Sequence, residues 1–164
     1  LIVLSQADSA RGARSYPLSL VADVAVHART PVLAVPITGP AFDPGGVAMV
    51  AWNGSPEAAH AARAALPMLK RAGAVRLITF DEDEDFPVDD VRRYLAAHGV
   101  TAESARHRLD GKSVGEALCV AASEHKAAYI VMGAYGHSRF REAVLGGVSR
   151  HMLAHSTVPL LLAH

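Results

Sequence analysis

The sequence predicts an α/β fold: an open five-stranded parallel sheet with helices on both of its faces. Two observations lead to this class. Short apolar runs alternate with helix-like segments throughout residues 47–164, as in repeated strand–helix–strand units. The runs are continuously apolar, which is typical of strands buried on both faces of a parallel sheet. Each crossover between parallel strands is expected to be right-handed.

The first predicted strand and helix have clear boundaries. Residues 47–53 (VAMVAWN) form the strand. Ser55 is a favourable N-cap and Pro56 suits the first helical position. A single helix is expected to run from there to Gly73, because glycine favours a helix end. The next predicted strand is residues 75–80 (VRLITF).

The rest of the chain continues this alternation. Ser113 and Glu116 have the spacing of a capping box, which marks the start of a helix. The elements predicted after residue 80 are a helix over residues 88–99, a more exposed strand over 100–109, a helix from Ser113 to about residue 126, a strand over 127–133, a helix over about 147–155 and a final strand over 158–164.

Composition excludes several classes of function. The 164 residues carry 16 basic and 16 acidic side chains, so a general nucleic-acid-binding protein is not indicated. No apolar run approaches the roughly 20 residues that span a bilayer, so no membrane partner is expected. A single cysteine, Cys119, excludes an intramolecular disulfide, and we expect it to be a packed helix residue in a reducing cytoplasm.

The first 36 residues resemble the last 36. A shift of 128 positions places His27 on His155 and Leu33 on Leu161 without a gap. Any strand–helix–strand unit looks somewhat like another, but the gapless spacing favours a duplication. Because the chain starts on what reads as a strand already under way, we expect it to be part of something longer. The predicted organisation is the end of a first domain in residues 1–36, a Pro- and Gly-rich linker in 37–46 and a complete second domain in 47–164.

Four glycines frame a basic loop after the strand over residues 127–133. Gly133 and Gly136 precede the loop, and Gly146 and Gly147 follow it. A helix N-terminus presents unpaired N–H groups, and residues without a Cβ let phosphate oxygens reach them. The pattern predicts a phosphate-binding loop, with glycines that serve only as turns as the alternative. The cationic side chains between the pairs are His137, Arg139 and Arg141. The first copy lacks the glycines and is expected to have lost the site.

The spacing G-x2-G-x9-G, after an apolar strand ending in VMG and before a helix and an apolar strand, resembles the universal stress protein family. The segment VAWNGSPEAAHAARAAL resembles that family's first strand and helix. The resemblance covers residues 47–164, and residues 1–36 resemble the end of a preceding domain, so the chain is similar to a tandem universal stress protein. This implies a Rossmann-like fold of the adenine nucleotide α-hydrolase type, a role in the stress response and, in nucleotide-binding members, ATP with Mg²⁺.

The resemblance also implies which residues contact the nucleotide. Gly133, Gly136 and Gly146 carry over as contacts to phosphate and ribose. Gly147 stands where the family usually has Ser or Thr, and the lost hydroxyl removes a hydrogen bond worth ~0.5–1.5 kcal/mol. Ser149 is expected to compensate in part. The implied contacts are Ala51, Trp52, Asn53, Phe80, Met132, Gly133, Gly136, His137, Arg139, Gly146, Gly147, Val148 and Ser149.

Three residues at strand ends bear on the nucleoside. Asn53 stands where the family has an acid, so it keeps an acceptor but loses the stronger charge-assisted contact. Phe80 falls where the family has an apolar residue beside adenine. Trp52 adjoins Asn53, and both packing and base stacking are open for it.

Two further clusters contain side chains of metal-ligating type. Residues 81–90 (DEDEDFPVDD) are explained by a solvated loop, and the alternative is help with the Mg²⁺ that accompanies phosphates. His151 and His155 are four residues apart, as in a metal-binding pair on a helix. No third ligand is evident from the sequence, so no metal site is predicted.

Three functions fit these observations. The first is a regulatory protein that binds ATP or another adenine nucleotide, with little or no catalysis, because no arranged nucleophile or general base is visible. The second is a scaffold that binds no nucleotide, which Asn53 and Gly147 favour. The third is an enzyme on the same layout, such as an adenine nucleotide α-hydrolase or an electron-transfer flavoprotein subunit.

Two apolar terminal strands predict pairing. The family resemblance implies that the segments from Pro31 to Val35 and from Pro159 to Ala163 lie side by side about a pseudo-twofold axis. The two domains would then form a pseudo-dimer, and the same strands are the expected contact of a homodimer. Apolar strand edges otherwise stay exposed, which favours such pairing.

Overall fold

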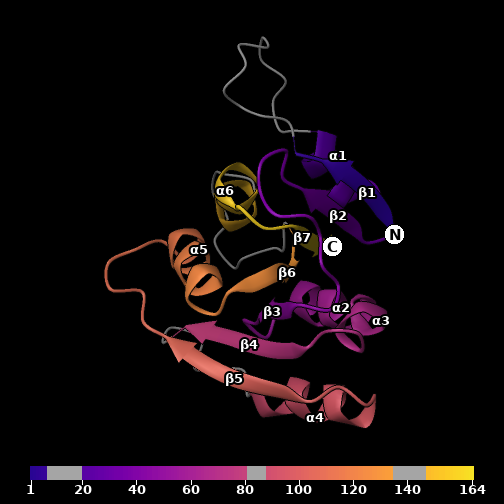
Figure 1. The fold of residues 1–164 in the computed structure, drawn as a ribbon, viewed down its shortest axis with the longest axis vertical. Coiled ribbons are helices and arrows are strands. Elements are labelled where there is room, and N and C mark those ends of the chain that lie inside the picture. Colours follow the sequence, from indigo (N-terminus) through magenta and orange to yellow (C-terminus); the bar gives the residue numbers. More distant parts are fainter. Residues whose placement is uncertain (7–19, 81–87, 135–146) are drawn as a thin grey trace.

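The computed structural model describes residues 1–6, 20–80, 88–134 and 147–164. A seven-stranded sheet forms the centre of the molecule, in the order β1-β2-β7-β6-β3-β4-β5 (Figure 1). Its strands are β1 (Ile2–Ser5), β2 (Val32–Val35), β3 (Val47–Ala51), β4 (Ala74–Phe80), β5 (Ala102–His107), β6 (Ala127–Gly133) and β7 (Leu160–Ala163). The helices are α1 (Leu20–His27), α2 (Pro56–Ala64), α3 (Leu66–Leu69), α4 (Val88–Ala97), α5 (Val114–Glu124) and α6 (Gly147–His155).

The five strands of residues 47–164 are parallel, as predicted. β3 lies at their centre, between β4 and β6. The chain proceeds from β3 to β4 and β5 on one side, and places β6 and β7 on the other. The strand order therefore reverses beside β3, and such a switch point is where open α/β sheets bind ligands.

Two hydrophobic clusters lie on the two faces of the sheet. Met49 and Ile130 belong to the cluster that also holds buried residues of α1, α5 and α6. Their neighbours Val50 and Val131 belong to the cluster that also holds buried residues of α2, α3 and α4. Successive strand residues point to opposite faces, and both faces are covered. This explains the continuously apolar strands that predicted a parallel sheet.

The helix predicted up to Gly73 is two helices. Its start is as expected, because the Ser55 hydroxyl accepts a hydrogen bond from the Ala58 N–H at 3.1 Å. α2 ends at Ala64, however, and α3 begins at Leu66. Pro67 explains the break, since proline has no N–H to donate and its ring crowds the preceding turn. The capping box is confirmed: the Ser113 N–H donates to the Glu116 carboxylate at 2.8 Å and the Glu116 N–H to the Ser113 hydroxyl at 3.3 Å.

The first 36 residues add two strands to the sheet. β1 is parallel to β2, and β2 is antiparallel to β7, in the register Val32↔Leu162, Leu33↔Leu161 and Ala34↔Leu160. The prediction that the two apolar terminal strands lie side by side is confirmed. The sheet consequently has seven strands: the predicted five plus two from the first 36 residues.

Candidate functional site

The ends of three neighbouring strands bring several predicted site residues to one edge of the sheet. Ala51 ends β3, Phe80 ends β4 and Gly133 ends β6, and β3 lies between the other two. The chain continues beside β4 at Trp52, because the Trp52 N–H donates to the carbonyl oxygen of Ile78 at 2.8 Å. Four predicted residues lie outside the described part of the chain: Gly136, His137, Arg139 and Gly146.

Apolar site residues share one side of the sheet. Ala51, Phe80, Met132 and Val148 all belong to, or pack against, the cluster that faces α5 and α6. Phe80 and Met132 are each 4 % exposed, so they present little surface of their own. Trp52 instead packs against the hydrophobic cluster on the opposite face of the sheet, which includes residues of α2 and α4. The predicted residues therefore divide between the two faces, and Trp52 lies apart from the others.

Gly133 has a packing reason for being glycine. A Cβ built there would lie 2.7 Å from the Ala58 nitrogen and 2.7 Å from the Glu57 carbonyl carbon. Those are backbone atoms of the first turn of α2, which cannot give way as a flexible side chain can. The missing side chain lets the start of α2 approach the end of β6 directly.

Gly147 has no such constraint from the described residues. It begins α6, and a Cβ built on it would meet none of their atoms within 4 Å. Ser149 lies in the first turn of the same helix and is buried, at 4 % exposure.

Asn53 makes a local contact. Its side-chain oxygen accepts a hydrogen bond from the Ser55 N–H at 3.2 Å, across Gly54, which has a φ of 72°. This is the geometry by which asparagine stabilises a turn. One acceptor lone pair is thus engaged in positioning the N-cap of α2.

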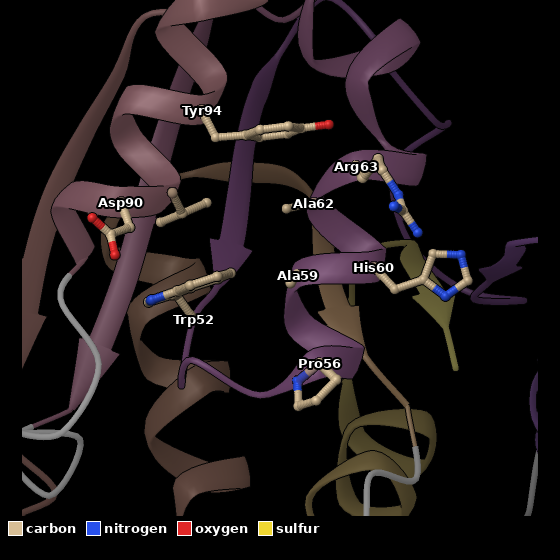
Figure 2. Close-up of a pocket in the computed structure, with 9 residues that line it drawn as sticks. Trp52, Pro56, Ala59, His60, Ala62, Arg63, Asp90 and Tyr94 are labelled. Carbon is tan, nitrogen blue, oxygen red and sulfur yellow. The ribbon is translucent and has the colours of Figure 1, made fainter.

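A cavity of about 480 Å³ opens between α2 and α4, beside Trp52 (Figure 2). Of the predicted site residues, only Trp52 lines it. The other lining residues were not predicted, because α2 and α4 are separate in the chain. Within each helix, the lining residues recur at helical spacing. The lining residues are Trp52, Pro56, Ala59, His60, Ala62, Arg63, Asp90, Val91 and Tyr94.

The histidine pair on α6 is a stacked pair. The ring centroids of His151 and His155 are 4.2 Å apart, and the His155 Nδ1–H donates to the His151 carbonyl oxygen at 2.9 Å. Among the described residues, no three side chains of metal-ligating type are grouped to hold an ion. Cys119 packs as expected, with its sulfur 3.7 Å from that of Met152. Burial, followed by the nearby Glu116 carboxylate, raises the pKa of its thiol.

A second histidine pair lies where β5 meets α5. The Nε2 atoms of His107 and His125 are 3.0 Å apart, and the His107 Nδ1 lies 3.7 Å from the Glu124 carboxylate. One ring must donate and the other accept in this contact. Burial lowers the pKa of His125, and the positive charges of His107 and Arg76 lower it further.

No helix in the described ranges is long and apolar enough to cross a membrane.

Comparisons with known proteins agree with this architecture. The model of the universal stress protein family matches residues 47–164, well over half of the chain. A universal stress protein from Archaeoglobus fulgidus has a similar fold, with a TM-score of 0.57 and 20% identity over 73% of this chain and 97% of that chain. Another, from Archaeoglobus fulgidus DSM 4304, has a TM-score of 0.61 and 21% identity, covering 81% of this chain and 49% of that one.

A universal stress protein solved in complex with cAMP is also similar in fold. Its TM-score is 0.52 and its identity 21%, over 74% of this chain and 99% of that chain. No curated protein matches the chain. The parallel sheet, its switch point beside β3 and the match over residues 47–164 lead to one conclusion. The chain belongs to the universal stress protein family.

Proposed function

We propose that this protein is a regulator that binds an adenine nucleotide at the carboxyl ends of β3, β4 and β6, with little or no catalysis. The observation that carries this proposal is that Ala51, Phe80 and Met132 lie at or next to the ends of β3, β4 and β6, and pack in one hydrophobic cluster with Val148 of α6. Ala51 and Val148 are only partly buried, so they offer apolar surface to a flat base, whereas Phe80 and Met132 are buried. The N-terminus of α6 packs on the same face of the sheet, and the partial positive charge of a helix N-terminus favours an anion.

Two further observations support the choice of ligand. A protein of similar fold was solved in complex with cAMP, which is an adenine nucleotide. None of the described residues lies within 4 Å of a Cβ built on Gly147, the first residue of α6, and a residue without a Cβ lets a phosphate oxygen approach the backbone. ATP with Mg²⁺ is the ligand that the family resemblance suggests, so the cofactor proposal is an adenine nucleotide with Mg²⁺.

Calorimetric titration with ATP and Mg²⁺, and separately with cAMP, tests the proposal. The wild-type protein is compared with Gly147→Ser, which adds the family's hydroxyl, and Gly147→Ala, which adds only a Cβ. The Cβ that both variants add meets none of the described residues within 4 Å. A neutral hydrogen bond contributes ~0.5–1.5 kcal/mol, so we expect the serine variant to bind several-fold more tightly than the alanine variant.

The alanine control separates two explanations. Equal gains in both variants would mean that a better helix former, and not the hydroxyl, strengthens the start of α6. Absence of binding heat in all three proteins contradicts nucleotide binding and leaves the scaffold function, in which paired domains serve only as an interaction surface.

We also propose that residues 1–36 end a first, degenerate domain, that 37–46 are a linker and that the β2–β7 ladder is the contact of a pseudo-dimer. The coverage of a longer solved relative supports this, since 81% of this chain aligns with 49% of that chain. Leu33 and Leu161 of this ladder are both buried, at 3 % and 1 % exposure.

Removal of residues 1–36 tests this organisation. The edge of β7 would lose its partner, and we expect the shortened protein to form a concentration-dependent homodimer through Pro159 to Ala163. Light scattering coupled to size-exclusion chromatography measures the mass. A folded monomer at all concentrations would contradict the pairing proposal.

A further inference from the structure

The cavity between α2 and α4 has two aromatic walls. Figure 2 shows the phenol ring of Tyr94 reaching from α4 across the upper part of the cavity, the indole of Trp52 lower down, and Ala59 and Ala62 of α2 beside them. Small alanine side chains leave room in front of the two rings. The volume of about 480 Å³ falls in the range of small-molecule sites, which are lined mostly by apolar and aromatic groups.

A guanidinium and an imidazole lie on the α2 side of the same cavity. The guanidinium of Arg63 and the imidazole of His60 lie close together in Figure 2. The exposed Arg63 forms no ion pair within the described part of the chain. The His60 Nδ1–H donates to the carbonyl oxygen of His164 at 2.8 Å, which holds the ring in place.

The opposite end of the cavity carries a compensated charge. Asp90 also lines the cavity, but its carboxylate is paired with the guanidinium of Arg93 on the same helix. The indole nitrogen of Trp52 is buried, has no hydrogen-bond partner among the described residues, and points toward the side of Asp90 in Figure 2. Among the described residues that line the cavity, the cation without an ion pair, Arg63, is therefore at the α2 end.

We propose that this cavity is a second ligand site, which binds a flat aromatic acid. The ring of the ligand lies against Trp52 and Tyr94, and its carboxylate pairs with Arg63. Aromatic rings gain ~0.5–1.5 kcal/mol beyond burial when they pack in offset or edge-to-face arrangements. Arginine is the residue best suited to a carboxylate, because its fork of N–H groups can donate two parallel hydrogen bonds.

The site is separate from the proposed nucleotide site. Trp52 packs on the α2–α4 face, whereas Phe80 and Met132 pack on the α5–α6 face. The proposal consequently does not depend on nucleotide binding, and each can fail alone.

Nitrogen-15 NMR of the full chain tests the proposal without ambiguity. Trp52 is the single tryptophan, so one indole N–H signal reports on the cavity. The probes are 2-naphthoate, its uncharged analogue 2-naphthalenemethanol, and the non-aromatic acid cyclohexanecarboxylate. We expect 2-naphthoate to shift the Trp52 signal in a saturable manner and to bind about tenfold more tightly than either control, because both the ring and the charge contribute.

Three variants assign the two halves of the ligand. Arg63→Gln is expected to lower the affinity for 2-naphthoate about tenfold and to leave the alcohol unaffected, as the loss of a charge-assisted hydrogen bond predicts. Tyr94→Leu keeps an apolar wall but removes the ring, and is expected to weaken 2-naphthoate several-fold. Lys70→Gln, an exposed cation that does not line the cavity, is the matched control and is expected to change nothing.

Several results would overturn the proposal. A Trp52 signal that does not move, equal binding of acid and alcohol, or equal effects of Arg63→Gln and Lys70→Gln each contradict it. Displacement of 2-naphthoate by ATP would show that the cavity belongs to the nucleotide site and is not a second one.

Discussion

Leu33 of β2 and Leu161 of β7 stand directly opposite each other at the centre of an antiparallel ladder. They are also the residues that the 128-residue shift superimposes. The flanking pairs are exchanged accordingly: Val32 is opposite Leu162, and Ala34 is opposite Leu160. The ladder therefore has a local twofold axis through Leu33 and Leu161, and it joins the strands of the first 36 residues to the remainder of the sheet.

Truncation of Leu33 tests the contribution of this contact to stability. Leu33→Ala is expected to lower the free energy of unfolding by ~2–5 kcal/mol, because it removes buried methyl groups and leaves a cavity. Leu20→Ala, at a leucine that is 67 % exposed, is the matched control and is expected to change it by less than ~0.5 kcal/mol. Urea denaturation followed by circular dichroism measures both. Similar losses in the two variants would contradict the structural role of the ladder.

The approach of α2 to β6 predicts that Gly133 cannot carry a side chain. Gly133→Ala is expected to cost ~1–3 kcal/mol of stability, because its Cβ would lie 2.7 Å from backbone atoms of Glu57 and Ala58. Gly147→Ala is the control, since its Cβ would meet none of the described residues within 4 Å. Thermal unfolding of both variants measures the difference. A Gly133→Ala protein as stable as wild type would show that α2 can move away without cost.

A buried hydroxyl predicts a stabilising substitution. Tyr129 is 0 % exposed, and its hydroxyl has no hydrogen-bond partner among the described residues. Burial, with a smaller effect of Asp43, raises its pKa to about 12. Tyr129→Phe keeps the ring in contact with Phe42, whose centroid is 5.5 Å away, and removes the unpaired group.

Leaving a buried polar group unpaired costs ~1–3 kcal/mol, so Tyr129→Phe is expected to raise the free energy of unfolding by about 1 kcal/mol. Urea denaturation of the two proteins provides the measurement. A marked loss of stability would reveal a hydrogen bond from this hydroxyl that the present geometry lacks.

The His107–His125 contact predicts a pH dependence of stability. The pKa of His125 is lowered in the folded state, so the unfolded chain binds a proton more readily than the folded one. The stability that this group contributes is present above its ordinary pKa near 6.5, and is lost as the pH falls through that value toward the lower pKa of the folded state.

The melting temperature is therefore expected to fall between pH 7.5 and pH 5.5, and to fall less in His125→Gln. His27→Gln, at an exposed histidine outside this cluster, is expected to retain the wild-type slope. Scanning calorimetry across this range gives the comparison. Parallel pH profiles for wild type and His125→Gln would exclude the contact as a source of the dependence.

Short-range patterns accounted for most of the elements. The strands at residues 75–80 and 127–133 were recognisable because burial on both faces favours apolar side chains at most positions. The capping box at Ser113 was recognisable because both of its hydrogen bonds join residues three apart. The prediction of a single helix up to Gly73 was wrong, because Pro67 divides it into α2 and α3.

Long-range contacts were less accessible. Gly133 was predicted to let a phosphate approach the backbone closely. In the structure, the group that lies close to Gly133 at the end of β6 is the backbone of Glu57 and Ala58. Nothing local to Trp52 or Tyr94 indicates that they line one cavity, since they lie on different elements. Residues 135–146 of the glycine loop lie outside the described ranges, and their predicted contacts stay predictions.

Residue spacing was enough to predict the α/β class, the parallel direction of the strands, the helix caps and the family, because each depends on patterns within a few turns or strands. Only the tertiary structure decided which face each strand-end residue occupies, what fills the space above Gly133, and that α2 and α4 leave a cavity beside Trp52. Those features depend on how separately formed helices settle on the sheet, and that distance is set by side-chain volume and backbone contact across the whole domain.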